Sequence, residues 1–381
     1  MSQAPPSGDR REPRLLHTLS SDVRQVTADL SLQGVASTFS ATLEDIESFY
    51  LDEARRQRMA RMGRVRRFIV RVFWLVRSLL MKLTPARRIL LALALLMLMP
   101  TVHIGGNVDF RIDLQHPLLS AILIVIVLML ELKDKLVARN ELVAGRAVQL
   151  ALMPPATPDV PGWDVWLYTQ PANDVGGDLI DHLRIDDRRH GIALGDVAGK
   201  ALPAALLMVK LQATLRALVP LHTTLDTLGA GVNRILHRDG LPNRFATLVY
   251  LILTEGDGAV RYLNAGHLPP LVMRHETGET IEELTGGSIA FGFIAEASFV
   301  ERHVDLAPGD TLVAVSDGVV EAMNGDGDFF GDDRLRAALA AAAGLSSQVR
   351  GEAVLDALRT FVGRAKPHDD VSVVVVRRLP A

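Results

Sequence analysis

Residues 178–196, DLIDHLRIDDRRHGIALGD, decide the interpretation of the fold and of the site. Asp178 opens one β-rich run and Asp196 closes the next, with turn-forming residues near the midpoint at 186–188. A hairpin centred there places the two aspartates roughly opposite each other at its open end. The stretch therefore predicts an antiparallel strand pair that presents two carboxylates at one edge of a sheet.

A second pair of acidic strand ends lies further along the chain. Asp317 follows the apolar run DTLVAVS, and Asp369 and Asp370 precede the run VSVVVV. If these two strands are antiparallel neighbours, their carboxylates also meet at one sheet edge. Glycines stand beside the acids, at Gly177 and Gly318 for example, and glycine allows backbone to approach a ligand closely.

Clustered carboxylates repel one another and raise each other's pKa unless cations lie between them. The chain has no cysteine and no His-x-x-x-His pair, so oxygen ligands for hard ions such as Mg²⁺ or Mn²⁺ are the fitting chemistry. Two such ions about 4 Å apart generate a bridging hydroxide and hold a phosphoryl group. The alternative is that Asp and Gly only mark turns, and four acids at matching strand ends favour the metal site.

The chain from residue 162 onward alternates short β-rich runs with turn clusters, and its helical stretches stand in separate blocks. This pattern predicts an α+β sandwich. The predicted strands are 163–169, 179–185, 190–196, 245–254, 258–264, 270–274, 279–284, 310–316 and 371–376. The predicted helices are 201–218, 223–238, 332–343 and 347–363.

Composition bounds the remaining possibilities. A length of 381 residues fits two or three domains, and 49% apolar against 22% charged residues excludes wholesale disorder. The absence of cysteine excludes disulfides, thiolate metal sites and cysteine nucleophiles. A net charge of −3 argues against a general nucleic-acid binder, and we expect no nucleic-acid partner.

The amino-terminal part predicts a membrane-associated region. Residues 1–15 are interpreted as a disordered terminus and 16–66 as a helical region, either a plain helical hairpin or a sensory module. The basic stretch before residue 68 suits nucleic acid or anionic lipid. Residues 68–83, which are apolar but carry spaced cations, favour a helix lying in the membrane surface.

Two apolar segments within the membrane region 67–132 predict a transmembrane hairpin at 89–104 and 117–132. Each is somewhat short against the roughly 20 residues of a membrane helix, so buried helices of a soluble protein are the alternative. Arg87 and Arg88 precede the first segment, and Lys133 and Lys135 follow the second. The positive-inside rule then places both ends in the cytoplasm, which predicts a multi-pass inner-membrane protein with a cytoplasmic carboxy-terminal domain.

A linker helix at 133–153 is predicted to follow the second segment. Its positions Leu136, Asn140, Val143, Ala147 and Leu150 repeat at steps of four and three, the spacing of a short coiled coil. Asn140 is then a polar core residue that sets the register. We expect a parallel homodimer through this helix, and prolines after it open a folded domain at 154–381.

Five ordered motifs resemble a known family. They are the segment ALMPPATPDVPGWDVWLYTQPANDVGGDLID, then GDVAGKALPAALLM, NAGHLPPLV, SDGVVEAMN and DDVSVVVV, together covering about residues 140–378. They are similar to motifs of the SpoIIE/RsbU-type phosphatases, bacterial members of the PPM (type 2C) metal-dependent protein phosphatases. The resemblance implies two β-sheets flanked by helices and hydrolysis of phosphoserine or phosphothreonine on a protein.

Carried over by position, the resemblance assigns roles to the acids. Asp178 matches the first acidic ligand and Asp196 the metal-bridging acid, and we expect these two to be catalytic. Val197 matches a backbone-carbonyl ligand, Asp317 another ligand, and Asp369 the last, with Asp370 as a possible substitute. The departures, which include Ala201 where a glycine is often found, remove no ligand.

Three other features are possible sites. Gly199-Lys200 suggests a phosphate-binding loop, but Leu194 stands where its first glycine belongs and Ala201 where Ser or Thr must hold magnesium. His267 is either a general acid or, the favoured interpretation, a turn histidine with local hydrogen bonds. His368 either orients a ligand or donates a proton to the leaving group.

The preferred hypothesis is a membrane-anchored serine/threonine phosphatase with two Mn²⁺ or Mg²⁺ ions and a metal-bridged hydroxide as nucleophile. The resemblance implies a regulatory phosphoprotein substrate such as an anti-sigma-factor antagonist. The alternative is a membrane receptor or scaffold whose phosphatase-like domain only binds a phosphoprotein. Intact acids argue against the alternative, because a scaffold has no need for a charged cluster.

Overall fold

The computed structural model describes residues 63, 66, 70, 74, 77, 80–104, 110–114, 116–240, 244–275 and 281–380. The chain divides into two compact units, residues 1–134 and residues 135–381. The predicted terminus 1–15, nearly all of the predicted helical region 16–66 and most of the predicted interfacial helix 68–83 lie outside the described residues.

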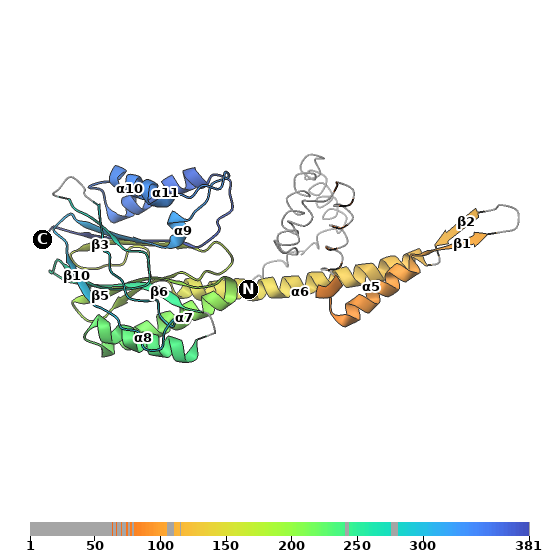
Figure 1. Ribbon diagram of the computed structural model, residues 1–381, viewed down its shortest axis with the longest axis horizontal. Coiled ribbons are helices and arrows are strands. Elements are labelled where there is room, and N and C mark those ends of the chain that lie inside the picture. Colours follow the sequence, from red (N-terminus) through yellow and green to blue (C-terminus); the bar gives the residue numbers. More distant parts are fainter. Residues whose placement is uncertain are drawn as a thin grey trace, which may run out of the picture. The chain divides into compact units, whose positions relative to one another are not determined.

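The first unit contains two packed helices and a small hairpin. Its elements are α5 (Pro85–Met97), β1 (Pro100–Ile104), β2 (Phe110–Leu114) and the start of α6 (Pro117–Leu152). The buried hydroxyl of Ser120 donates to the Ala94 carbonyl oxygen at 2.7 Å. Arg87 forms ion pairs with Glu131 at 2.7 Å and with Asp134 at 2.6 Å. The contacts run in opposite order along the two helices, so α5 and α6 are antiparallel (Figure 1).

The predicted first span, 89–104, is wrong in its second half. Helix α5 ends at Met97, and residues 100–104 form strand β1, which pairs antiparallel with β2. Pro100 has no amide hydrogen for a helical bond, and the β-branched Thr101 and Val102 favour extended backbone. With 13 residues at about 1.5 Å each, α5 is about 20 Å long. The predicted second span, 117–132, and the predicted linker, 133–153, form the single 36-residue helix α6.

Within the described part of the chain, one helix has the length and apolar composition needed to cross a membrane, at Ala201–Leu221. This segment lies in the second unit and is 44% buried there. That burial is expected of a core helix. With 13 residues, helix α5 is shorter than the roughly 20 residues of a membrane helix. The apolar residues of α6 give way to charged ones at Glu131, Lys133 and Asp134.

The second unit is a sandwich of two antiparallel sheets. One sheet has the order β10-β7-β6-β5-β4 and the other the order β3-β12-β11-β8-β9. The strands of the first are β4 (Leu179–Arg184), β5 (Arg189–Val197), β6 (Ala246–Thr254), β7 (Ala259–Ala265) and β10 (Arg302–Asp305). Those of the second are β3 (Trp163–Gln170), β8 (Leu271–Met273), β9 (Ile281–Glu283), β11 (Thr311–Val315) and β12 (Val371–Arg378).

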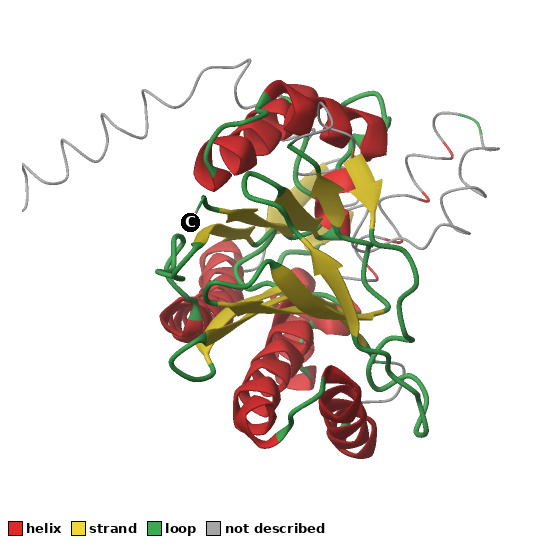
Figure 2. Cartoon of the chain, turned by 90° about the vertical axis from the view of Figure 1, so that its left-hand side faces the viewer, coloured by secondary structure: helices red, strands yellow, loops and turns green. Residues whose placement is uncertain are grey.

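Helices cover the outer face of each sheet, which gives four layers (Figures 1 and 2). Helices α7 (Ala201–Leu218) and α8 (Leu225–Asp239) pack on the first sheet, with a short 3₁₀ turn η1 (Val219–Leu221) after α7. Helices α10 (Gly331–Ala341) and α11 (Ser347–Val362) pack on the second sheet, and the short α9 (Asp317–Val320) follows β11.

Alternating side chains build three apolar layers, one between the sheets and one under each pair of helices, because each sheet is covered on both faces. On β12, Val374 and Val376 pack between the sheets, whereas Val373 and Val375 pack under α10 and α11. The predicted α+β sandwich and all of its predicted strands and helices are confirmed, with ends shifted by a few residues. The sequence interpretation missed β10 and α9, which are four residues long each.

Candidate metal centre

The hairpin of β4 and β5 carries the first two acids as predicted. Leu179 pairs with Gly195, so Asp178 and Asp196 stand one step beyond the last pair, side by side at the open end. At the other end, Asp186 accepts hydrogen bonds from the backbone amides of the turn, which holds the register. The prediction that these two carboxylates share one sheet edge is confirmed.

Strands β11 and β12 carry the other acids and are antiparallel neighbours, again as predicted. Val315 pairs with Val373, so the chain after β11 runs beside the chain before β12. A Cβ atom at residue 318 would lie 2.0 Å from the Asp370 carbonyl oxygen, so only glycine fits at Gly318. This close approach brings Asp317 beside the Asp369-Asp370 pair.

The two acidic edges belong to different sheets and are joined by hydrogen bonds. Ser372 on β12 donates its hydroxyl to Asp178 Oδ2 at 2.5 Å. Asp370 Oδ2 accepts from the amides of Gly177, at 2.6 Å, and of Asp178, at 3.3 Å. Asp370 Oδ1 accepts from the Ala172 amide at 2.7 Å. The ends of β4 and β12 are therefore fastened together at the site.

Burial and mutual repulsion raise the pKa values of three of these acids. The pKa of Asp178 lies well above its usual range because of burial, and the charges of Asp196 and Asp370 add to the shift, against the hydrogen bond from Ser372. Burial, followed by the charges of Asp317 and its neighbours, raises the pKa of Asp196 to about 6.

The pKa of Asp317 is raised by burial and then by the charges of Asp369 and Glu321. All five acids singled out in the sequence therefore lie in one electrostatic neighbourhood. Among the described residues, no three His, Asp or Glu side chains are already gathered as closely as ligands around an ion. The donor set nevertheless fits a hard divalent cation, because buried carboxylates with raised pKa values lack the positive charge that would stabilise their ionised forms.

The Val197 carbonyl oxygen has free space beside it because residue 177 is a glycine. A Cβ atom at Gly177 would lie 3.2 Å from the Val197 carbonyl oxygen and 3.5 Å from Asp196 Oδ1. The missing side chain leaves room beside both oxygen atoms. The expected carbonyl ligand and the expected bridging acid therefore border the same space.

Asp369 and Asp370 differ sharply in their surroundings. Asp370 is 7% exposed and its oxygens are occupied by three backbone amides. The Asp369 side chain is 48% exposed, and Lys200 Nζ lies 3.5 Å from its Oδ2. Lys200 also donates to the His368 carbonyl oxygen at 2.9 Å. Sequence reasoning considered Lys200 only as part of a phosphate-binding loop and missed its place beside Asp369.

Ala201, at the start of α7, has a φ of 61°, in the left-handed region that favours glycine. This is the position where the resembling family often has glycine. Gly199, two residues earlier, has a φ of 126°. The Arg244 guanidinium fills the space that a side chain at position 199 would need, and it donates to the Ala198 carbonyl oxygen at 2.7 Å. Backbone geometry thus explains why this turn is rich in small residues.

The two weighed histidines have different settings. His267 Nδ1 lies 2.9 Å from the Thr247 hydroxyl, a local contact, and burial lowers the pKa of His267 to about 4. A neutral imidazole at physiological pH does not suit a general acid. His368 is exposed and lines a pocket beside Asp369.

Gln149 near the end of α6 is a further residue that the sequence gave no reason to single out. Its side chain is 4% exposed, donates to the Gly176 carbonyl oxygen at 2.9 Å and accepts from the Gly176 amide at 3.2 Å. Gly176 lies two residues before Asp178. A polar residue on the buried side of a helix would have pointed to Gln149. Which side of α6 is buried is known only from the fold.

Comparisons with known proteins bear on the family and on the fold. A family model described as "Stage II sporulation protein E (SpoIIE)" matches residues 186–379. Protein IcfG of Synechocystis is 26% identical over 275 residues, which cover 65% of this chain and 43% of IcfG. The phosphoserine phosphatase RsbU of Bacillus subtilis is 25% identical over 240 residues, which cover 63% of this chain and 70% of RsbU. The matched region thus spans less than half the length of IcfG.

The solved SiaA-PP2C domain of Pseudomonas aeruginosa superposes with a TM-score of 0.56 at 19% identity, over 64% of this chain and 98% of that domain. The two-sheet fold of the second unit is therefore that of the PP2C domains. The chain belongs to the SpoIIE family.

Proposed function

We propose that the chain is a metal-dependent phosphatase that removes phosphate from serine or threonine of a regulatory phosphoprotein, such as an anti-sigma-factor antagonist. The observation that carries the proposal is the meeting of acids from two sheets at one edge, with the pKa values of three of them raised. The similarity to RsbU, whose name is phosphoserine phosphatase, supports the same reaction.

Asp178, Asp196, Asp317 and Asp369 are the side chains that would hold two Mn²⁺ or Mg²⁺ ions, with the Val197 carbonyl oxygen beside them. Such ions lower the pKa of a bound water and neutralise phosphoryl charge. We assign Asp370 to a positioning role, because its oxygens are already occupied by amides.

The protein's own groups prepare the site for phosphate. The Ser372 hydroxyl orients Asp178, and Asp370 holds the Gly177 amide so that the Val197 carbonyl oxygen stays open. Lys200, beside Asp369, supplies a positive charge that favours a dianionic phosphate at this edge. The net reaction consumes one water and releases the serine hydroxyl and inorganic phosphate.

The test uses the full chain in detergent with Mn²⁺ and measures phosphate release from a phosphoprotein. Asp196→Asn should abolish turnover while circular dichroism stays unchanged. Asp187→Asn is the matched control, because Asp187 lies on the same hairpin at its opposite, exposed end. Full turnover in Asp196→Asn would refute the metal assignment. Absence of divalent-ion binding in calorimetry would instead favour a phosphoprotein-binding scaffold.

We also propose that residues 85–132 attach the chain to the inner membrane, with the phosphatase domain in the cytoplasm. Support comes from large apolar side chains that stand exposed on both helices, among them Leu96 (67%), Leu118 (76%) and Leu128 (61%). Such a surface is costly in water and suits lipid. Cell fractionation tests the proposal. Recovery of the full chain in the soluble fraction without detergent would contradict it.

A further inference from the structure

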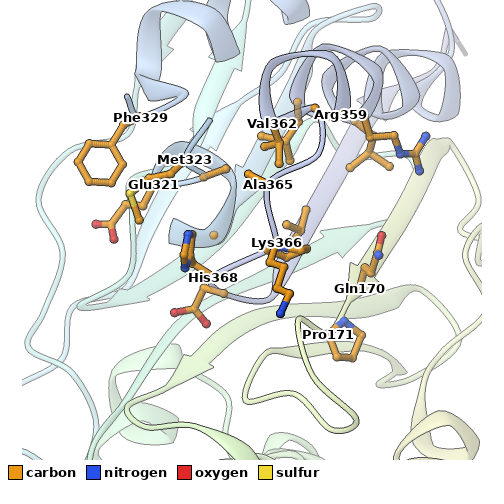
Figure 3. Close-up of a pocket in the computed structure, with 18 of the residues that line it drawn as sticks. Gln170, Pro171, Glu321, Met323, Phe329, Arg359, Val362, Ala365, Lys366 and His368 are labelled. Carbon is orange, nitrogen blue, oxygen red and sulfur yellow. The ribbon is translucent and has the colours of Figure 1, made fainter. Parts of the chain in front are cut away.

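A pocket with a volume of about 450 Å³ lies directly beside the candidate metal centre (Figure 3). Its walls come from the end of β3, from α9 and the segment after it, and from α11 and the segment that leads to β12. The volume falls within the range of about 300–1,000 Å³ that is usual for ligand sites. The roles proposed above use Asp369 and Lys200 at one edge of this pocket but not its apolar lining.

The pocket has an apolar floor and an apolar rim. Leu355 and Leu358 of α11 are buried beneath it, and Met323 and Val362 are half-buried in its walls. Phe329 and Met323 lie on one side of the opening and Val362 on another (Figure 3). Phe329 is 56% exposed, although phenylalanine has one of the largest apolar side chains. Covering these side chains with an apolar group would be favourable.

The pocket and the metal centre share residues. Gly318 and Asp369 line the pocket and also belong to the acidic edge, and Lys200 beside Asp369 lines it as well. A peptide whose phosphate reaches the carboxylates therefore passes the pocket within a few residues. The shared residues thus favour a segment of the phosphoprotein over a separate small ligand as the occupant of the pocket.

The charged side chains that line the pocket are of both signs. Lys200, Arg359 and Lys366 are cations, against the anions Glu321 and Asp369. Arg359 pairs with Asp356 at 3.1 Å, and Lys200 lies 3.5 Å from Asp369. These charges nearly balance, so the apolar residues of the lining are what favour a large apolar side chain.

We propose that this pocket binds a large apolar side chain of the phosphoprotein substrate, close in sequence to the phosphorylated serine or threonine. The inference rests on the proposed phosphatase function and adds a specificity site to it. The occupant is a leucine- or phenylalanine-sized side chain on the same segment that presents the phosphate. Substrates that lack it bind less tightly at the same catalytic edge.

The experiment uses the full chain in detergent and a set of phosphoserine peptides in which one leucine is moved along an otherwise alanine and serine sequence. Fluorescence polarisation measures peptide binding to the Asp196→Asn variant with Mn²⁺. Hydrolysis by the parent chain is measured in parallel as the ratio of kcat/KM for each peptide to kcat/KM for p-nitrophenyl phosphate. The small substrate reports the catalytic edge without the pocket.

We expect the peptides with leucine at one or two of the tested positions to bind about tenfold more tightly than the peptide without leucine. Phe329→Ala and Val362→Asp should each remove most of that preference and lower the kcat/KM ratio by a similar factor. Phe293→Ala is the matched control, because Phe293 is also exposed, at 62%, but does not line the pocket. This variant should keep the preference.

The outcomes separate the pocket from the phosphatase function. Equal binding of all peptides, or a leucine preference that survives in Phe329→Ala and Val362→Asp, overturns the pocket assignment even if hydrolysis is intact. Loss of self-association in Phe329→Ala, without any change in peptide binding, assigns the pocket to a second copy and also overturns it. An inactive parent whose Asp196→Asn variant still shows the pocket-dependent preference refutes the catalytic function but supports the pocket.

Discussion

Asp369 and Asp370 are adjacent in sequence but have opposite surroundings. Asp370 is buried and bonded to three amides, whereas Asp369 is half-exposed beside Lys200. Asp370→Asn should lower the free energy of unfolding of the metal-free protein by about 1–3 kcal/mol, because an amide group cannot accept all three hydrogen bonds.

Asp369→Asn is the natural comparison for that variant. It should leave the free energy of unfolding nearly unchanged but weaken Mn²⁺ binding in calorimetry. Urea denaturation without divalent ions measures the first quantity for both variants. Equal losses of stability in the two variants would contradict the division of roles between these neighbours.

Asp196 gives a pH dependence of defined sign. Its pKa is raised from 3.8 to about 6 in the folded protein, so folding is favoured while the group is protonated and this stability is lost as pH rises through about 6. Asp196→Asn should therefore make the metal-free protein more stable above about pH 6, on the order of 1–2 kcal/mol, with no gain below about pH 4. Thermal unfolding in EDTA across this range measures the difference. A gain that is independent of pH would contradict the assigned cause.

Ala201 stores backbone strain at the start of α7. Its φ of 61° is costly for alanine by roughly 1–2 kcal/mol and easy for glycine. Glycine also raises the entropy of the unfolded chain, so Ala201→Gly should increase the free energy of unfolding by less than about 1 kcal/mol. Ala205→Gly, inside the same helix, should destabilise by about 1 kcal/mol and serves as the control in urea denaturation.

At the scale of elements, the end of α6 contacts the segment that carries Asp178. Replacement of the Gln149 side chain by leucine would leave the amide and carbonyl of Gly176 buried without partners. Gln149→Leu should therefore lower the free energy of unfolding by about 1–3 kcal/mol and weaken Mn²⁺ binding. Val148→Ala changes an exposed neighbour on the same helix and should do neither.

The second half of α6 carries the apolar stripe expected of a dimer. Leu136, Val143 and Leu150 are each about half-exposed in the single chain, and apolar side chains at this spacing suit a second helix. Val143→Asp should weaken self-association of the full chain in detergent by about tenfold or more in analytical ultracentrifugation. Val148→Asp, also exposed but off the stripe, is the control. Identical sedimentation of both variants and the parent chain would contradict the predicted dimer.

Strands and helices were predictable where local pattern and burial agree. Strand β12 is a run of valines buried on both faces, and the β4–β5 hairpin has turn residues at its midpoint. Strand β10 was missed because its sequence, RHVD, has one apolar residue and a polar remainder at a sheet edge. The first predicted membrane segment, 89–104, was too long for a similar reason. Hydropathy does not take account of the amide hydrogen that Pro100 lacks.

The placement of the acids was predictable from the sequence, but the groups that hydrogen-bond around them were not. Strand register alone places Asp178 opposite Asp196, so the sequence suffices there. The bonds of Asp370 to Gly177 and of Gln149 to Gly176 span 193 and 27 residues, and no local pattern reveals them. The pocket likewise depends on how α9 and α11 pack over the second sheet.

At the scale of the whole molecule, one carboxylate joins the two halves of the sandwich at the site. Asp370, at the start of a strand in one sheet, bonds the amides of Ala172 and Gly177 that lead into the other sheet. These two amide protons can exchange with deuterium only when that junction opens. Their exchange rates thus report how often the candidate metal centre opens with no substrate present. Slower exchange on adding Mn²⁺ would show that bound ions hold the two sheets together there.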